Sequence, residues 1–342
     1  MKNRIYALDF IRVISAFGII CHHFCRELQS KGIQTNIWLG GDYKNGNYGW
    51  FFVTLFFILS GIVLHMNYPE VKVHDLKDFY FKRWKSTFPI FYLAWLYYYL
   101  YNVLEFGKIF YCGNPFRILW TIIGVDGYIS CRFPTYYILG EWYLGAIVFL
   151  YLIYPLIIYL YNKSRLLSGG GILILFFLVD YTNISFQSGP FRSIISCLLS
   201  FYIGMILLDF RITVEHGRPC LILSFVLAFI LFFMKIPIIS ANIQVHILGT
   251  VCFIIFWRIG KKVMTFANAK TFIMLLSHIS YPVFLLQHVV ISQIVRNIVW
   301  DNLSMTKYLI FLILSGVLII FQAWMLSMLF NALRNIFLQR NR

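Results

Sequence analysis

Residues 5–25 read IYALDFIRVISAFGIICHHFC, an apolar stretch that also carries one carboxylate, one guanidinium and two imidazoles. A membrane-spanning helix needs about 20 mostly apolar residues, and this stretch has that length. Its apolar part, from about Tyr6 to Phe24, is too long for the hydrophobic region of a secretory signal, and no small-residue cleavage site follows it. We therefore predict that residues 5–25 form a first membrane helix that is retained.

The composition of the whole chain also indicates a membrane protein. Of its 342 residues, 60% are hydrophobic, 20% are aromatic and only 12% are charged, and the mean hydropathy is +0.76. Soluble domains carry about 25% charged residues, so the composition argues against a soluble enzyme, a disordered chain and a secreted disulfide scaffold. The net charge of +16 is explained by basic loops that face an anionic leaflet, and no nucleic-acid partner is expected.

Ten stretches have the length and apolar character of membrane helices. The fold class that we predict is all-α: a polytopic transmembrane bundle of about ten spans, forming a single integral-membrane domain over residues 1–342. If the N-terminus is cytoplasmic, the inner loops hold roughly twice as many Lys and Arg residues as the outer ones, so both termini are predicted to be cytoplasmic. The connection 261–278 is predicted to be a basic interfacial helix. The ten stretches are 5–25, 49–67, 84–104, 138–161, 170–184, 190–209, 218–235, 243–259, 280–300 and 307–332.

Ionisable residues within the first helix indicate a function, because such groups are costly inside a membrane. Arg12 and His23 are eleven positions apart, which is about 20° beyond three full turns, and Asp9 lies within about 60° of both. One face of the helix thus carries all three groups, with the imidazole about 16 Å deeper than the guanidinium. His22 points about 100° away and is predicted to pack. The alternative is a structural ion pair between Asp9 and Arg12 beside a structural His23.

Two further polar groups lie at or within predicted spans. Lys82, Arg83 and Lys85 lie at the cytoplasmic end of the third span, where they form either a phosphate clamp for an anionic donor or a positive-inside anchor. Gln287 and His288 lie about 12 Å into the ninth span.

The cysteines do not predict a metal site. Cys21, Cys25 and the two histidines between them point in several directions from one helix, so no metal is expected. Cys112 and Cys131 share a predicted outer loop and form either a disulfide or two free thiols. Tyr136, Tyr137 and Trp142, in or next to the same loop, are candidates for stacking on a sugar ring.

Several of these motifs together resemble the membrane acyltransferase-3 family. Leu8-Asp9-Phe10-Ile11-Arg12, with ten residues between Arg12 and His23, is similar to the opening signature of that family. Later stretches agree in order and spacing, and the resemblance covers nearly the whole chain. They are Phe56-Phe57-Ile58-Leu59-Ser60-Gly61, Lys82-Arg83 leading to Phe88-Pro89, Glu141-Trp142-Tyr143-Leu144 through Tyr154-Pro155, and Ser280-Tyr281-Pro282-Val283-Phe284-Leu285-Leu286-Gln287-His288.

The resemblance implies an O-acyltransferase of the polysaccharide O-acetyltransferase type. Such an enzyme takes an acyl group, most often acetyl, from cytosolic acyl-CoA and delivers it to a carbohydrate hydroxyl at or beyond the outer face. The family's essential residues then correspond to Arg12 and His23, and its donor-binding residue to Arg83. Ser86 is a departure, because a second arginine often stands there in the family. Lys82 and Lys85 are the available substitutes, although a lysine is a point charge rather than a bidentate fork.

We expect His23 to act as the general base, oriented by Asp9 and Arg12, with an acyl-histidine intermediate as a variant. Lys82, Arg83 and Lys85 are the candidate donor-binding residues. Further pocket candidates are Ser60, His288, Gln287, Glu141 and Trp142.

No bound cofactor is expected, because acetyl-CoA is a co-substrate. The expected partners are acyl-CoA, a surface or capsular polysaccharide or lipid-linked glycan, and membrane lipid. The expected location is the cell membrane, as a multi-pass protein of the bacterial plasma membrane. A glycan transporter or flippase is the main alternative, but the chain has no convincing inverted pair of broken helices. Composition does not separate a glycan acceptor from a protein or lipid acceptor.

Overall fold

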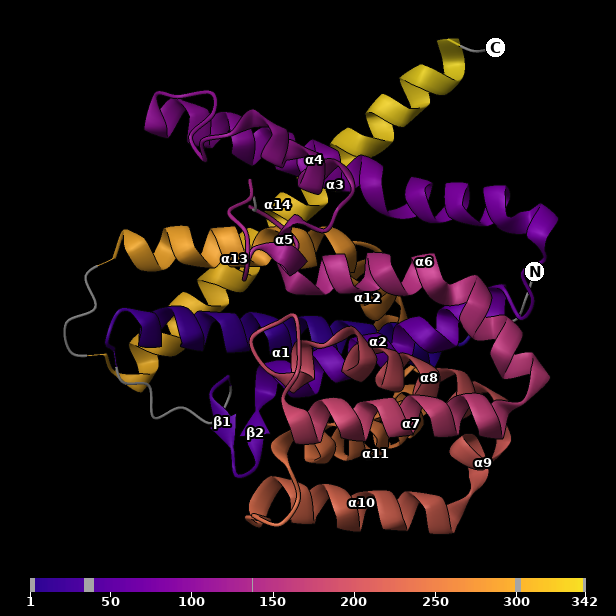
Figure 1. The fold of residues 1–342 in the computed structure, drawn as a ribbon. Coiled ribbons are helices and arrows are strands. Elements are labelled where there is room, and N and C mark those ends of the chain that lie inside the picture. The colour runs from indigo at the N-terminus through magenta and orange to yellow at the C-terminus, as the bar shows by residue number, and fades with distance from the viewer. Residues whose placement is uncertain (1–3, 34–39, 137, 299–302, 341–342) are drawn as a thin grey trace. The chain divides into compact units, whose positions relative to one another are not determined.

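The computed structural model describes residues 4–33, 40–136, 138–298 and 303–340, and within them the chain is almost entirely helical (Figure 1). One two-stranded antiparallel hairpin pairs Asp42 with Asn47 and Tyr43 with Gly46. The elements are α1 Tyr6–Ser30, β1 Asp42–Tyr43, β2 Gly46–Asn47, α2 Tyr48–Asn67, η1 Val73–Asp75, α3 Leu76–Phe106, η2 Pro115–Arg117, α4 Ile118–Ile122, α5 Asp126–Ile129, α6 Glu141–Lys163, α7 Arg165–Thr182, η3 Pro190–Arg192, α8 Ile194–Asp209, α9 Arg211–His216, α10 Arg218–Phe233, α11 Ala241–Val263, α12 Ala267–His278, α13 Ser280–Arg296 and α14 Met305–Arg340.

The all-α membrane fold is confirmed. Each of the ten predicted stretches coincides with a helix. In the described part of the chain, α1, α2, α6, α7, α11 and α14 are long and apolar enough to cross a membrane, and α12 with α13 forms a pair bent by 63° that counts as a seventh candidate. α8 and α10 are apolar but shorter. The number of spans and the side of the termini stay predictions.

Several predicted boundaries differ from those of the helices. The third stretch, predicted to start at residue 84, belongs to a helix that begins eight residues earlier, at Leu76. The predicted start of the fifth helix at residue 170 is too late, because Ser164 caps α7 and its Oγ accepts a hydrogen bond from the Leu167 amide at 3.3 Å. The glycines 169–171 therefore lie inside α7 rather than before it. The interfacial helix predicted over 261–278 is also shorter, because α11 continues to Val263 and α12 begins at Ala267.

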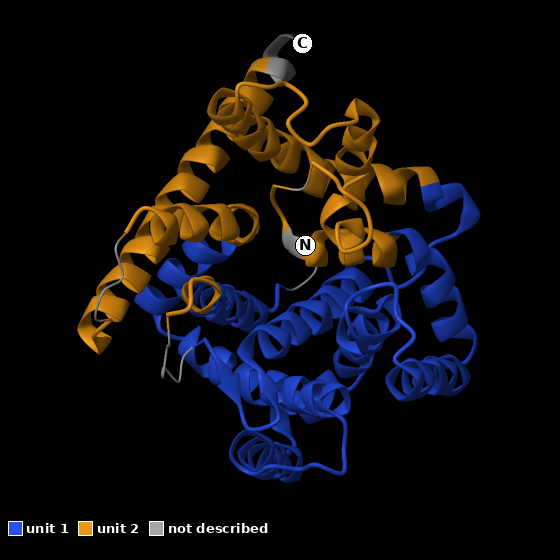
Figure 2. Cartoon of the chain, turned by 60° about the vertical axis from the view of Figure 1, so that its left-hand side comes forward, with its two compact units in different colours: residues 1–26, 34–76, 152–278 blue, residues 27–33, 77–151, 279–342 orange. Residues whose placement is uncertain are grey.

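The chain forms two compact units, each built from separate stretches of sequence (Figure 2). Unit 1 comprises Met1–Arg26, Gln34–Leu76 and Leu152–His278, and unit 2 comprises Glu27–Ile33, Lys77–Tyr151 and Ile279–Arg342. The prediction of a single domain stays a prediction, and each unit is described by itself.

Close contact between helix backbones forms the core of unit 1. A Cβ on Gly61 of α2 would lie 1.9 Å from the Phe201 carbonyl oxygen, and a Cβ on Gly204 of α8 would lie 2.0 Å from the Ile58 carbonyl oxygen. Small residues allow membrane helices to approach in this way, and the tight van der Waals packing stabilises the pair. Gly249 brings α11 equally close to the side chain of Thr54, so α2 packs between α8 and α11.

α1 packs onto the same core through other glycines. Gly18 of α1 faces the ring of Phe52 on α2, and Gly260 of α11 faces the ring of Phe10 on α1. These contacts orient the helix that carries the predicted polar face.

Polar anchors hold the helices of unit 2 together. The hydroxyl of Tyr98 in α3 donates to Gln322 Oε1 in α14 at 2.8 Å. The hydroxyl of Tyr281 in α13 donates to the carbonyl of Thr87 in α3 at 3.1 Å. α13 therefore contacts α3 close to the basic residues in the N-terminal part of α3.

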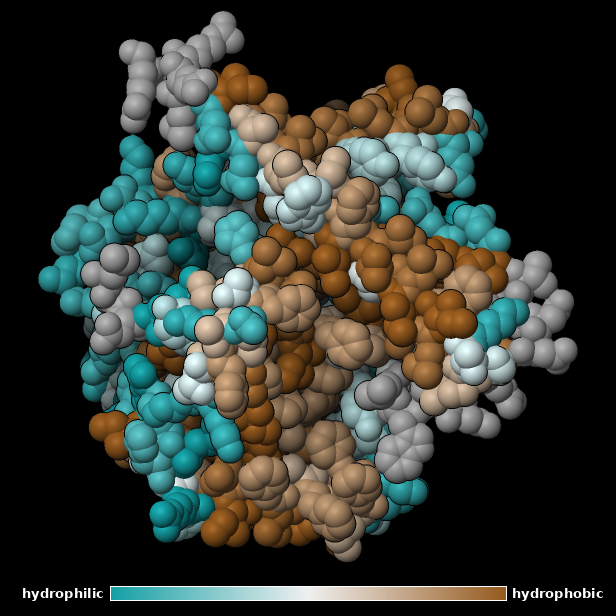
Figure 3. Space-filling model, turned by 180° about the vertical axis from the view of Figure 1, so that it is seen from behind, coloured by the Kyte–Doolittle hydropathy of each residue, from teal (hydrophilic) through white to brown (hydrophobic). Residues whose placement is uncertain are grey.

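Large apolar side chains are exposed along α7, α10 and α14, among them Phe177, Phe229 and Ile313. The face drawn in Figure 3 carries broad apolar areas beside hydrophilic ones. Such areas exceed what a soluble protein exposes, and they fit helices that are covered by lipid.

Candidate active site

The first turn of α1 holds Asp9 in a closed hydrogen-bond network. Asp9 is 4% exposed. Its Oδ1 accepts hydrogen bonds from Arg12 Nη1 at 3.0 Å and from Ser277 Oγ at 2.7 Å, while Arg12 Nη1 also donates to Ser277 Oγ at 2.9 Å. Arg4 donates to the same carboxylate from Nε at 3.0 Å and from Nη2 at 3.1 Å. The positive end of the helix dipole also favours a carboxylate at this position. Because Arg12 Nη1 is hydrogen-bonded to both Asp9 and Ser277, its guanidinium is held in one orientation.

Further cations surround this network. The ring of Tyr6 contacts both Lys270, whose Nζ is 3.9 Å from the ring centroid, and Arg4, whose Cζ is 5.7 Å from it. Lys270 and Ser277 both come from α12, so this helix closes over the beginning of α1. Two guanidiniums and one ammonium outweigh the one carboxylate, which makes this end of α1 attractive to an anion.

His23 lies on the same unbroken helix as Arg12, about 16 Å further along the helix axis. His23 is half-buried, and its ring centroid is 5.7 Å from that of His22. The Nδ1 of His22 is 2.7 Å from the Gly40 carbonyl oxygen, and because a carbonyl can only accept, Nδ1 carries the proton. A Cβ on Gly49 of α2 would lie 2.4 Å from His22 Nε2, so the His22 ring is packed between Gly40 and α2. His22 thus has a structural role.

The other unit 1 candidate, Ser60, is half-buried on α2. It immediately precedes Gly61, the point of closest contact with α8.

The basic residues of unit 2 that the sequence singles out lie in the second and third turns of α3. Lys82 and Lys85 are exposed, whereas Arg83 is half-buried with its Cζ 5.8 Å from the ring centroid of Tyr151. This cation–π contact orients the guanidinium. Ser86, at the position of the family's second arginine, donates from its hydroxyl to the Arg83 carbonyl at 2.8 Å.

α13 carries the remaining polar candidates of unit 2. Gln287 is 1% exposed, and its Oε1 has no hydrogen-bond partner among the described residues. His288, the next residue along the chain, is half-buried. Trp142, at the start of α6, is half-buried too. The side chain of Glu141 lies outside the described part of the structure.

The family comparison covers all of the predicted site residues. The sequence model of the acyltransferase-3 family, described as an acyltransferase domain, matches residues 5–328. The chain belongs to this family. No curated protein and no solved structure matches it. The chain is therefore a multi-pass membrane acyltransferase.

In this acyltransferase, the sequence alone did not predict two partners of Asp9, namely Arg4 and Ser277. Arg4 precedes the helix, where its sequence position indicates only one of the basic residues of the N-terminal segment. Ser277 lies 268 positions from Asp9, and only the packing of α12 against α1 brings the two together. The sequence signal for Ser277 is weak: it is a polar residue directly after the apolar run 272–276 of α12.

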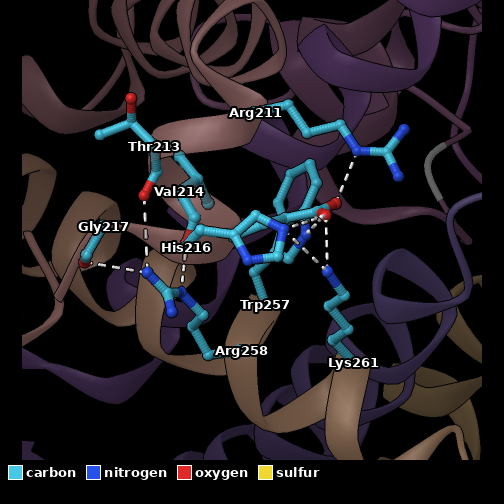
Figure 4. Close-up of polar contacts among 9 residues, drawn as sticks. Arg211, Thr213, Val214, His216, Gly217, Trp257, Arg258 and Lys261 are labelled. Carbon is cyan, nitrogen blue, oxygen red and sulfur yellow. Dashed lines mark hydrogen bonds and ion pairs between the residues drawn. The ribbon is translucent and has the colours of Figure 1, made fainter.

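A second network of the acyltransferase-3 chain, shown in Figure 4, joins α9 to the end of α11 and was also missed. Glu215 accepts hydrogen bonds from Arg211 Nε at 2.6 Å and from Lys261 Nζ at 2.8 Å. Burial raises the pKa of the Glu215 carboxyl, but these cations outweigh it and lower the pKa overall. Arg258 donates to the carbonyls of Val214 and Gly217, which caps the short helix α9.

The outer-loop prediction for Tyr136 is wrong. Tyr136 is fully buried, and its hydroxyl donates to the Gly113 carbonyl at 3.1 Å, so its ring is not available to a sugar. Tyr137 lies outside the described residues. Among the described residues, Cys112 and Cys131 are not bonded to each other, and Cys131 Sγ donates to the Tyr128 carbonyl at 3.5 Å.

The same loop buries an acid. Asp126 is 1% exposed, and burial raises the pKa of its carboxyl to about 6, although hydrogen bonds from Thr121 and Gly127 lower it in part. A carboxyl with that pKa changes charge close to neutral pH.

Proposed function

We propose that this acyltransferase moves an acetyl group from cytosolic acetyl-CoA to a hydroxyl of an extracytoplasmic surface or capsular polysaccharide, or of its lipid-linked precursor, at the bacterial plasma membrane. The observation that carries the proposal is α1 itself. One unbroken helix holds an oriented guanidinium, Arg12, and an imidazole, His23, about 16 Å apart on one face.

The chemistry assigned to His23 is proton transfer. Its neutral imidazole accepts the proton of the acceptor hydroxyl while the hydroxyl oxygen attacks the carbonyl carbon of the thioester. The new C–O bond forms, the C–S bond breaks, and the thiolate of coenzyme A leaves and takes up the proton. General-base catalysis of this kind contributes typically 10²–10⁴-fold to a rate. A neutral histidine is also less costly inside a membrane than a fixed charge.

The assigned role of Asp9 and Arg12 is to bind the donor at the cytoplasmic end of α1. The network around Asp9 fixes the guanidinium of Arg12, and the excess of cations there suits the phosphates of an acyl-CoA.

Lys82, Arg83 and Lys85 are the assigned donor-binding residues of unit 2. The two lysines are exposed and Arg83 is oriented by Tyr151, which supports two point charges and one directed fork for the nucleotide phosphates. The Oε1 of buried Gln287, which has no partner in the described part of the chain, can accept a hydrogen bond from a substrate. Ser60, Trp142, Glu141 and His288 stay pocket candidates. No bound cofactor is needed, because the donor supplies the activated acyl group.

The proposal is tested with purified protein in liposomes. Acetyl-CoA labelled in the acetyl group is added on one side of the membrane, together with polysaccharide or lipid-linked glycan from the organism that makes the protein. The label on glycan, on lipid and on protein is then counted separately. The proposal expects label in the glycan as an alkali-labile ester. Label confined to lipid or protein would contradict the glycan acceptor, and glycan movement without any label transfer would support a transporter instead.

A further inference from the structure

Unit 1 contains a cavity that none of the candidate site residues touches. It lies between α7, α8 and α11 and has a volume of about 380 Å³. Its walls are almost wholly apolar, with Leu173 and Phe177 from α7, Ile203 from α8 and Ile247 from α11. Leu173, Phe177 and Ile247 are between 38% and 52% exposed, so this side of the cavity faces the surroundings of the bundle.

His246 lines this cavity together with two hydroxyl residues, Tyr202 and Thr250, and the Thr250 hydroxyl already donates to the His246 carbonyl at 2.8 Å. His246 is 4% exposed, and its Nδ1 is 2.7 Å from Oγ of Ser200, which is 1% exposed. Its Nε2 is buried and has no hydrogen-bond partner among the described residues. The rings of Phe176 and Phe191 flank the imidazole, with centroids 5.1 and 6.0 Å away, and offer no oxygen acceptor.

Counting hydrogen bonds identifies the tautomer. If Ser200 donates its hydroxyl proton to Nδ1, the only unsatisfied group is the Nε2–H of His246. If Nδ1–H donates instead, both the hydroxyl proton of Ser200 and the lone pair of Nε2 lack partners. A buried polar group without a partner costs about 1–3 kcal/mol, so the arrangement with one such group is favoured. His246 therefore offers one hydrogen-bond donor.

Water is a poor occupant of such a cavity. A buried water molecule typically makes about three hydrogen bonds, and apolar cavities stay dry. The hydroxyl of Tyr202, another lining residue, is already engaged by Ser168 at 2.7 Å and by the Arg165 carbonyl at 2.7 Å. The cavity thus fits an occupant that is mostly hydrocarbon and carries one acceptor near His246.

We propose that this cavity binds one acyl chain of an ester-linked bilayer phospholipid, with an ester carbonyl oxygen accepting a hydrogen bond from Nε2–H of His246. The position along α11 supports this. His246 lies about 8 Å along the helix from its N-terminal end, in the first third of the helix, so an ester group bonded to it has most of the helix length beyond it for the acyl chain. The lining residues of α11 continue from there to Val251, deeper along the same helix.

Competition between two lipids tests the hydrogen bond directly. The protein is purified in detergent that contains equal amounts of ester-linked and ether-linked phosphatidylglycerol of the same chain length, and the retained lipids are counted by native mass spectrometry. One neutral hydrogen bond predicts about a threefold to tenfold preference for the ester lipid at one site. The variant His246→Phe keeps a ring and removes the donor, so it should retain both lipids equally. Equal retention by the natural protein, or a preference that survives in His246→Phe, would overturn the proposal.

A matched pair on α7 tests the cavity without touching the buried histidine. Leu173 lines the cavity and is 43% exposed, whereas Leu175 lies two residues away, is 48% exposed and does not line it. Leu173→Trp should abolish the ester preference and retain one lipid fewer, while Leu175→Trp should behave as the natural protein does. An unchanged Leu173→Trp would refute the cavity as the binding site, whatever the outcome of the acyl-transfer assay.

Discussion

Replacing Asp9 by asparagine tests whether the network at the start of α1 stabilises the fold. The asparagine oxygen can still accept from Arg12 and Ser277, but as a neutral acceptor its hydrogen bonds have roughly half the strength. The amide nitrogen that replaces the other oxygen cannot accept from Arg4, and that loss is small because the Arg4 side chain is 54% exposed. We expect the free energy of unfolding to fall by about 1–3 kcal/mol.

The measurement is equilibrium unfolding of the purified protein in mixed micelles, followed by helical signal. Asp42→Asn is the matched control, because Asp42 also pairs with an arginine, Arg26, but its side chain is 62% exposed. The control should change the free energy of unfolding by less than about 0.5 kcal/mol. Adding Ser277→Ala to Asp9→Asn should show coupling of about 0.5–1.5 kcal/mol. Equal losses for Asp9→Asn and Asp42→Asn would refute the reasoning.

Four further substitutions give separate outcomes in the same unfolding assay. Gly61→Ala should destabilise strongly, by more than about 2 kcal/mol, because its Cβ would meet the Phe201 carbonyl oxygen, whereas Gly171→Ala has open space and should be neutral or stabilising by up to about 1 kcal/mol. Asp126→Asn should stabilise the protein at pH 7.5. The raised pKa means that the natural protein gains up to about 3 kcal/mol as pH falls from about 6 towards 4, and the variant should lack that gain. Glu215→Gln should cost roughly 1 kcal/mol at neutral pH. Because the pKa of Glu215 is lowered, its contribution is present above about pH 4.3 and lost below it, and the variant should lose that acid dependence.

Two of these outcomes would contradict the account in a simple way. A Gly61→Ala variant as stable as Gly171→Ala would mean that α2 and α8 are not in backbone contact. An Asp126→Asn variant with an unchanged pH profile would mean that the carboxyl of Asp126 is not buried.

Much of the fold could be predicted because apolar length alone identifies membrane helices. Each predicted stretch coincides with a helix over most of its described length, and the Asp9–Arg12 pair follows from spacing on one helix. Local breaker signals were less reliable. The glycines 169–171 lie inside α7, and Pro89 and Pro155 lie inside α3 and α6, because helix packing outweighs local propensity.

The parts that could not be predicted depend on contacts between distant segments. The pairing of Ser277 with Asp9 and that of Ser200 with His246 have no periodic signal in the sequence. The burial of Tyr136 was missed for a related reason, since an aromatic residue in a loop has the same sequence appearance whether it packs inward or faces solvent.

The central proposal, that His23 is the proton acceptor, is tested most directly by the initial rate of labelled acetyl transfer in a His23→Ala variant. The variant is compared with the natural protein from pH 5 to 9, after equilibrium unfolding has shown that both are equally stable. The proposal predicts a rate at least about 100-fold lower and the loss of the rise in rate with pH that deprotonation of a general base produces. A variant that transfers acetyl within about twofold of the natural rate, with the same pH profile, would contradict it.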